Sequence, residues 1–186
     1  MRYTDSKTRG LRALAVATLM GCVVSGCGDD GPTALGPASV QELFGPQLHR
    51  ADGSPVGIQA LDGVSVIGIY FASPGCPACG AFSPLLIEAY EDLQEEGRSF
   101  EVVMVSLGIT ESVLFDYMVE FQMPWLAVSP QNSKAQDLVQ RYDVRWVPTL
   151  VIVDHAGQTL SLNGREELTL DGTAAYDRWL AAGGGG

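Results

Sequence analysis

The sequence is short of cysteine, and this shortage limits the kinds of site that the protein can build. Only four cysteines occur among 186 residues, and Cys22 and Cys27 both lie near the start of the chain. Cys76 and Cys79 are the only thiols left for a folded domain. A single close pair excludes the disulfide framework of a small secreted domain. It also lacks the further ligands of a structural zinc site, because the two histidines stand singly. We therefore expect no metal and no cofactor.

Positive charge is scarce as well. Residues 1–26 hold four of the eleven basic residues and one of the 22 acidic residues. The rest of the chain keeps seven basic and 21 acidic residues, and Lys134 is its only lysine. Such a surface repels phosphate backbones, so nucleic acid is not an expected partner.

The apolar run near the start of the chain is too short to span a bilayer. It covers residues 13–24, whereas a spanning helix needs roughly 20 apolar residues. Four basic residues precede the run, and a basic start with a short apolar run is typical of a secretory signal. We interpret residues 1–26 as a signal peptide, with a single-pass anchor as the alternative.

The residues Val24-Ser25-Gly26-Cys27 resemble the cleavage site of a bacterial lipoprotein signal. The resemblance implies that Cys27 becomes the N-terminus and carries lipid; ordinary secretion without lipid is the alternative. Each buried lipid methylene contributes about 0.8 kcal/mol, so a multiply acylated Cys27 would hold the protein to a membrane. We expect a bacterial cell-envelope protein, lipid-anchored and facing the periplasm or the extracellular side.

The remaining chain divides into a tether, one domain and a short tail. Residues 27–39 contain Gly, Asp, Pro and Ser without apolar periodicity, which indicates a flexible tether, and residues 183–186 are all glycine. Residues 40–182 are expected to form one α/β domain in three layers. The apolar patterns predict strands at 64–71, 100–107 and 149–153, hairpins near 47–56 and 154–162, and helices at 79–96, 111–121, 133–142 and 173–182.

The motif Cys76-Pro77-Ala78-Cys79 lies between a predicted buried strand and a predicted helix. In that context a Cys-x-x-Cys pair indicates thiol–disulfide exchange. We expect Cys76 at the first helical turn, where unpaired N–H groups and the helix dipole stabilise a thiolate. Such settings lower a cysteine pKa from about 8.5 to roughly 3.5–7.5. Cys79 is close enough to resolve a mixed disulfide on Cys76. A purely structural disulfide is the alternative, although so small a loop restrains the unfolded chain little.

A second candidate feature is Pro148, which stands just before the strand predicted at 149–153. A proline fits the start of a strand because it has no N–H to donate. If the Val147–Pro148 bond were cis, the backbone of Val147 would lie beside the sulfurs and could pair with an extended substrate. A trans proline that merely begins the strand is the alternative, since only about 5–6% of X-Pro bonds are cis.

Together these residues resemble the thioredoxin superfamily, and within it the tryparedoxin and nucleoredoxin group. The likeness includes the string Met123-Pro124-Trp125 and extends over most of the domain, at residues 43–45, 52–53, 70–71, 76–79, 81–85, 100–103, 123–128, 142–144, 147–152 and 163–168. It implies a thioredoxin fold, with a central mixed β-sheet flanked by helices on both faces. It also implies a nucleophilic Cys76, a resolving Cys79 and a cis Pro148, and it places Tyr70 where thioredoxins carry a buried acid.

The sequence departs from this family at two positions beside the motif. Gly75 stands where the family usually has tryptophan, and Gly80 stands where it usually has a basic residue. Both changes affect partner preference and redox poise more than the exchange chemistry. Trp146 is interpreted as packing at the edge of the site, and Arg165 as a solvated surface residue.

The leading hypothesis is an extracytoplasmic thiol–disulfide oxidoreductase, acting as a protein-disulfide reductase. Its expected partners are protein thiols and disulfides, such as those of apocytochrome c or other envelope proteins, together with an unidentified electron donor. We expect a monomer. The alternative is a non-catalytic binding module on the same fold. A copper handler is disfavoured because the wider cysteine spacing and the partnering histidine are missing, and a peroxide handler because it would need a differently placed peroxidatic cysteine.

Overall fold

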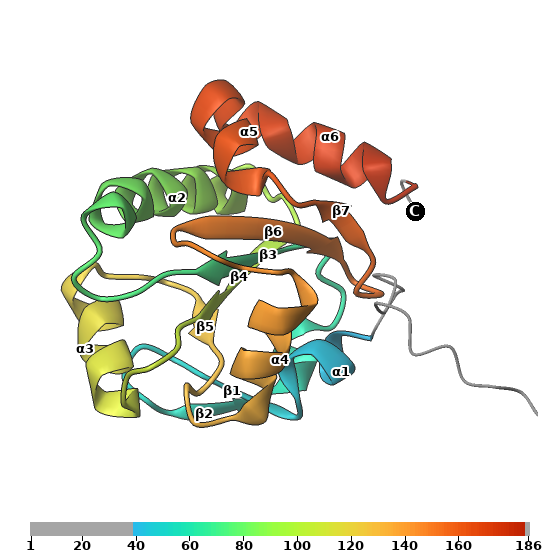
Figure 1. Ribbon diagram of the computed structural model, residues 1–186. Helices are drawn as coiled ribbons and strands as arrows, with labels where there is room; N and C mark the ends of the chain where they lie inside the picture. Colours follow the sequence, from blue (N-terminus) through green and yellow to red (C-terminus); the bar gives the residue numbers. More distant parts are fainter. Residues whose placement is uncertain (1–38, 185–186) are drawn as a thin grey trace, which may run out of the picture. The chain divides into compact units, whose positions relative to one another are not determined.

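The computed structural model describes residues 39–184 (Figure 1). The predicted signal peptide, Cys27 and most of the predicted tether lie outside the described residues, as do Gly185 and Gly186. The strands are β1 Gln47–His49, β2 Pro55–Gly57, β3 Val66–Phe71, β4 Phe100–Val105, β5 Leu126–Ala127, β6 Thr149–Asp154 and β7 Thr159–Ser161. The helices are α1 Val40–Phe44, α2 Pro77–Glu95, α3 Glu111–Glu120, α4 Ser133–Arg141, α5 Gly164–Asp171 and α6 Ala175–Ala182, with 3₁₀ turns at Ile58–Leu61 and Gly172–Ala174.

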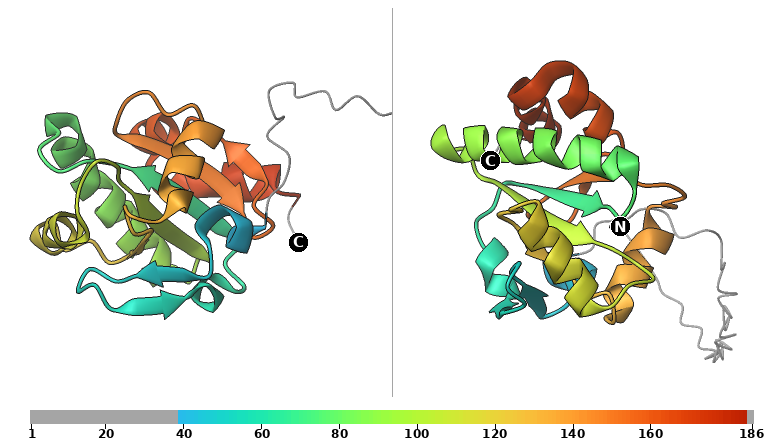
Figure 2. Two further views of the ribbon diagram at one scale, coloured as in Figure 1. Left: turned by 60° about the horizontal axis from the view of Figure 1, so that its bottom comes forward. Right: turned by 90° about the vertical axis from the view of Figure 1, so that its left-hand side faces the viewer.

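The seven strands form one mixed sheet in the order β2-β1-β5-β4-β3-β6-β7. Strand β4 pairs in parallel with both β3 and β5, whereas β6 is antiparallel to β3 and to β7. The first hairpin joins the sheet through an antiparallel pair between β1 and β5. The predicted α/β architecture, with helices on both faces of a mixed sheet, is confirmed (Figures 1 and 2).

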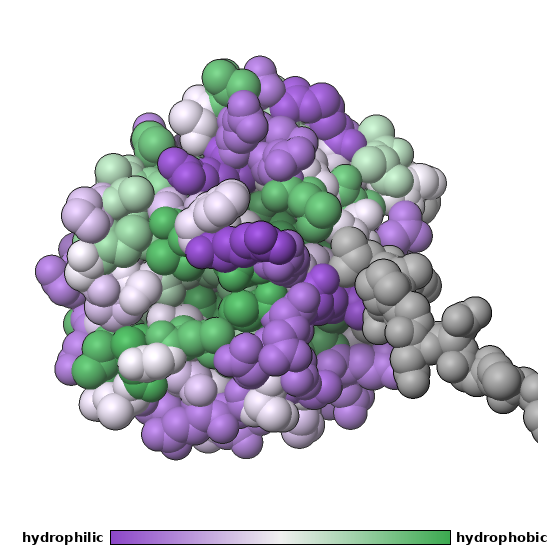
Figure 3. Space-filling model, in the orientation of Figure 1, coloured by the Kyte–Doolittle hydropathy of each residue, from purple (hydrophilic) through white to green (hydrophobic). Residues whose placement is uncertain are grey.

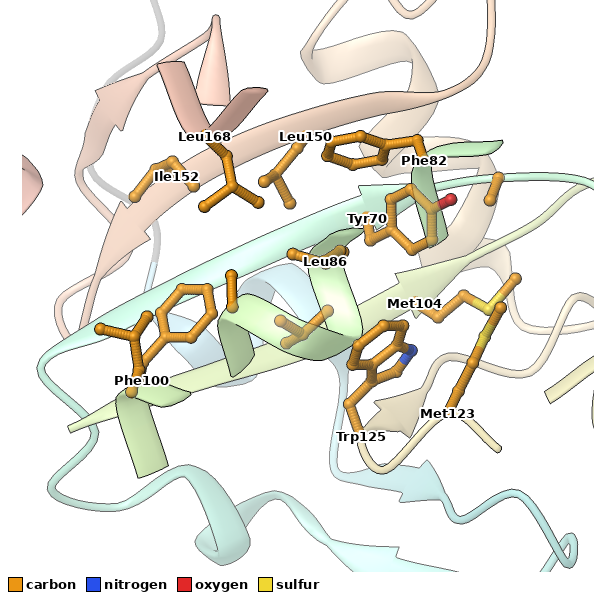
Figure 4. Close-up of a cluster of buried hydrophobic side chains, with 14 of the residues drawn as sticks. Tyr70, Phe82, Leu86, Phe100, Met104, Met123, Trp125, Leu150, Ile152 and Leu168 are labelled. Atoms are coloured by element: carbon orange, nitrogen blue, oxygen red, sulfur yellow. The ribbon is translucent and has the colours of Figure 1, made fainter. Parts of the chain in front are cut away.

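Two apolar clusters, one on each face of the sheet, hold these layers together. Alternate residues of β3 supply both: Val66 and Tyr70 belong to one cluster, and Ile67, Ile69 and Phe71 to the other. Residues of α2, α3, α5 and α6 complete the first cluster, part of which Figure 4 shows, and residues of α1 and α4 complete the second. Full burial of one such large apolar side chain stabilises the fold by about 1.5–3 kcal/mol.

The centre of the sheet sets the position of the cysteine motif. All six residues of β3 are buried, as expected for a strand covered on both faces. In the register of β3 with β6, Phe71 lies opposite Thr149. The end of β3, which leads to the cysteine motif, therefore lies beside the start of β6, which follows Pro148.

Helix α2 begins two residues before its predicted start. Cys76 is its N-cap residue, and Pro77 occupies its first position, where the missing N–H has no helical partner to lose. Pro84 lies inside the helix. None of the helices among residues 39–184 is long and apolar enough to cross a membrane.

Three elements were not predicted from the sequence. Helix α1 begins with a capping box between Ser39 and Glu42, and this sequence pattern does indicate a helix start there. Strand β5 has only two residues and shows no periodicity of its own. Helix α5 has no side-chain cap at Asn163, and its first residue, Gly164, weakens the helical pattern.

Gly164 is needed where α5 packs on β6. An alanine Cβ at this position would lie 2.8 Å from the Ile152 side chain and 2.9 Å from the Leu150 carbonyl oxygen. We expect Gly164→Ala to lower the free energy of unfolding by about 1–3 kcal/mol, as overpacking usually does. Denaturant unfolding followed by circular dichroism measures this loss.

Gly80→Ala is the matched control, because it adds a Cβ inside α2 that would lie 3.8 Å from its nearest neighbour, the ring of Phe121. It should raise the free energy of unfolding by about 0.5–1 kcal/mol. A Gly164→Ala protein as stable as the parent would show that α5 does not depend on this close approach.

Candidate active site

Cys76 lies at the start of α2, where the structure directs hydrogen bonds toward its sulfur. The backbone N–H of Cys79 donates to Cys76 Sγ at 3.2 Å. The sulfur thus takes the place of a side-chain cap oxygen, next to the positive end of the helix dipole. Cys76 is half-buried, so an external disulfide has access to it, whereas Cys79 is completely buried.

The two thiols differ in acidity for identifiable reasons. A hydrogen bond from the Cys79 thiol lowers the pKa of Cys76 most, and the backbone N–H groups of Cys79 and Ala78 lower it further against the opposing effect of partial burial. Burial is the main cause that raises the pKa of Cys79 to about 12. The pair therefore combines a thiol that ionises readily with one that keeps its proton.

Val147 and Pro148 lie against the cysteines, as their predicted role requires. The Val147–Pro148 peptide bond is cis. The Cys76 thiol lies 3.7 Å from the Val147 carbonyl oxygen, to which it can donate. Within residues 39–184 no hydrogen-bond acceptor is found for the Val147 N–H. The unpaired N–H of Val147 can pair with an extended polypeptide brought to Cys76.

Arg165 is exposed, as interpreted from the sequence, and it also contacts the site. Its guanidinium lies over the Phe82 ring, 5.9 Å from the ring centre, and its Nη1 donates to the Pro148 carbonyl oxygen at 3.4 Å. Its charge helps to lower the pKa of both Cys76 and Cys79. Helix α5 thus supplies a positive charge that Gly80, beside the motif, does not. Arg165 follows the glycine that begins α5, and nothing in its local sequence indicates that α5 brings it against Pro148.

Two hollows lie at the candidate site, one bordered by the cysteine motif and one by Pro148 and Arg165. One, of about 460 Å³, lies between the start of α2 and α3. The residues that line it include Cys76, Gly80, Tyr117 and Phe121. The other, of about 410 Å³, lies toward α5 and includes Pro148, Arg165 and Trp146 in its lining. Trp146 flanks the site in the lining of this hollow, but it is 74% exposed and is not packed in the core. On the face seen in Figure 3, apolar residues lie between polar ones at the surface.

Within the described part of the chain, no three side chains of His, Cys, Asp or Glu are grouped so that they could hold a metal ion.

The contact of Arg165 with the site predicts a measurable effect on acidity. Arg165→Gln removes the positive charge that stabilises the thiolate, so the pKa of Cys76 should rise. The ultraviolet absorbance of the thiolate, followed against pH, measures the change. Arg178→Gln is the control, because Arg178 pairs with Asp171 and is not among the main groups that shift the pKa of either thiol. Equal Cys76 pKa values in the two variants would contradict the assignment.

Comparison with known proteins identifies the family. A family model described as thioredoxin-like matches residues 63–159. The chain is 32% identical over 147 residues to nucleoredoxin from Bos taurus and, equally, from Homo sapiens. Those matches cover 76% of this chain but 33% of the relatives, so the chain spans about a third of their length.

Solved structures agree in fold and length. Native tryparedoxin I from Crithidia fasciculata superposes with a TM-score of 0.63 at 32% identity, over 73% of this chain and 94% of that protein. Tryparedoxin from Trypanosoma brucei gives a TM-score of 0.66 at 29% identity, over 76% of this chain and 99% of that protein. The chain therefore belongs to the thioredoxin-like family of thiol–disulfide oxidoreductases, in the group of the nucleoredoxins and tryparedoxins.

Proposed function

We propose that this protein reduces disulfides of other proteins outside the cytoplasm, with Cys76 as nucleophile and Cys79 as resolving thiol. The observation that carries the proposal is the position of Cys76 Sγ at the start of α2, where it accepts a hydrogen bond from the Cys79 N–H at 3.2 Å. This hydrogen bond favours the thiolate, and the thiolate is the species that attacks a disulfide.

The reaction consists of two exchanges. The Cys76 thiolate attacks one sulfur of the substrate disulfide, so that a mixed disulfide forms and the other substrate sulfur leaves as a thiolate. Cys79 then loses its proton and attacks Cys76 Sγ, which releases the second substrate thiol. The substrate gains two electrons, and the protein is left with a Cys76–Cys79 disulfide. A thiol electron donor of unidentified nature would return that disulfide to the reduced form.

The surroundings of Cys76 support a polypeptide as the substrate. An extended segment can form backbone hydrogen bonds with the Val147 N–H beside the sulfur. Trp146, 74% exposed on the adjoining hollow, offers an aromatic surface for its side chains. We propose the reductase direction because many thioredoxin-like proteins tethered to a membrane deliver electrons, for example to apocytochrome c.

Reduction of insulin by dithiothreitol tests the catalytic part of the proposal. The parent protein should accelerate the appearance of turbidity, and Cys76→Ser should return the rate to that of dithiothreitol alone, because serine forms no disulfide. Cys79→Ser is the matched variant: it should accumulate a mixed disulfide with the substrate that excess dithiothreitol releases.

Equal turbidity rates for the parent and Cys76→Ser would contradict the proposal. Unchanged partner binding by Cys76→Ser, together with those equal rates, would instead support a non-catalytic binding module.

We further propose that Cys27 carries lipid and tethers the domain to the bacterial cell envelope, on its periplasmic or extracellular side. The short apolar run and the residues Val24-Ser25-Gly26 before Cys27 support this location. In bacterial cells that express the full chain, Cys27→Ser should abolish incorporation of labelled fatty acid and shift the protein out of the membrane fraction. Cys22→Ser is the control and should leave both unchanged. Loss of the label with Cys22→Ser alone would place the lipid on the other cysteine.

A further inference from the structure

Three buried hydroxyl groups form a continuous chain inside the first apolar cluster. The Tyr70 hydroxyl is hydrogen-bonded to Ser83 Oγ at 2.9 Å, and Ser83 Oγ to the Tyr117 hydroxyl at 3.3 Å. Tyr70 and Ser83 are fully buried, and Tyr117 is only 5% exposed. Figure 4 shows the ring of Tyr70 among apolar neighbours such as Phe82 and Leu86.

Packing alone does not require these hydroxyls. Hydrogen bonds between neutral buried groups have a small net effect on stability, and a fully apolar replacement of the same shape is often neutral. Phenylalanine would fill the space of either tyrosine. Packing therefore does not account for a chain of hydroxyl groups in this apolar cluster.

The chain passes through Ser83, one helical turn from the resolving thiol. Ser83 follows Cys79 by four residues on α2, so the two side chains lie on the same face one turn apart, and both are fully buried. Burial raises the pKa of Tyr70 and of Tyr117, and negative charge on Cys79 or Cys76 would raise each further. The tyrosines therefore stay protonated, and they are close enough to both sulfurs for a charge there to act on them.

The proposed reaction needs a route for a buried proton. Burial raises the pKa of Cys79 to about 12, yet Cys79 must lose its proton as it attacks the mixed disulfide. Tyr117 lines the hollow of about 460 Å³ that also borders Cys76. The hydroxyl chain therefore connects the turn of α2 that holds Cys79 with a place that solvent can occupy.

We propose that Ser83 and Tyr117 carry the proton of Cys79 to solvent during resolution, and that Tyr70 orients Ser83. This inference rests on the proposed function. In the step, the Cys79 S–H bond breaks and its proton passes to Ser83 Oγ, which gives its own proton to the Tyr117 hydroxyl, and this hydroxyl gives its proton to water. The sulfur electrons of Cys79 form the bond to Cys76 Sγ, and the electrons of the broken disulfide leave on the substrate thiolate.

Ellman's reagent separates the two exchanges, because each releases one coloured thiolate: the first when Cys76 attacks, the second when Cys79 resolves. Tyr117→Phe and Ser83→Ala should leave the first phase unchanged and slow the second about 100-fold at neutral pH, as the loss of a positioned proton-transfer group does. An unchanged first phase also shows that each variant is folded. Tyr90→Phe is the control, because the Tyr90 hydroxyl bonds to Glu101 instead, and both phases should match the parent.

The pH profile distinguishes proton transfer from a structural role. The charged or titratable groups that act on the acidity of Cys79 are Cys76 at the start of its own helix and Arg165 on α5. Cys79 in turn acts on Tyr70 on β3 and Tyr117 on α3, and the charge of Glu120 on α3 also raises the pKa of Tyr117. In the variants the second phase should accelerate tenfold per pH unit as hydroxide takes over, while the parent changes less. A second phase equal to that of the parent, or a slow one that does not respond to pH, would overturn the proton route. A parent protein without any first phase would overturn the proposed function itself.

Discussion

The sulfur of Cys76 has to lie at the amino end of a helix, and the rest of the structure serves that position. Helix α2 can begin there because the central strand β3 ends at Phe71 and the chain then turns toward Pro77. The antiparallel pairing of β3 with β6 brings the Val147 backbone to the same place. Because Cys76 caps α2 and Cys79 lies in its first turn, unwinding of that turn would remove the Cys79 N–H from Cys76 and leave an ordinary thiol.

The function also depends on the contrast between the two thiols. Cys79 is held neutral by the same apolar cluster that packs α2 against the sheet, and its thiol then donates to the Cys76 sulfur. Each unit of difference in pKa corresponds to 1.36 kcal/mol of differential interaction. Core packing is therefore part of the chemistry, and it also creates the need for a route by which the proton of Cys79 can leave.

The sequence predicted the elements whose patterns are strong and local. The apolar, β-branched run ending at Phe71 and the cysteine motif before a helical pattern both carry their signal within a few residues. Ser83, Tyr117 and Arg165 could not be placed in the same way, since they come from different turns or elements and meet only through tertiary packing. The cis bond at Pro148 was implied by family resemblance alone, because most X-Pro bonds are trans.

The rate at which iodoacetamide alkylates Cys76, followed against pH in the folded protein and in denaturant, tests the central claim most directly. If hydrogen bonds at the start of α2 stabilise the thiolate, the folded protein should show an inflection below the ordinary cysteine value, and unfolding should return it to about 8.5. The same inflection in both states would contradict the account, because the helix would then contribute nothing to the acidity of that sulfur.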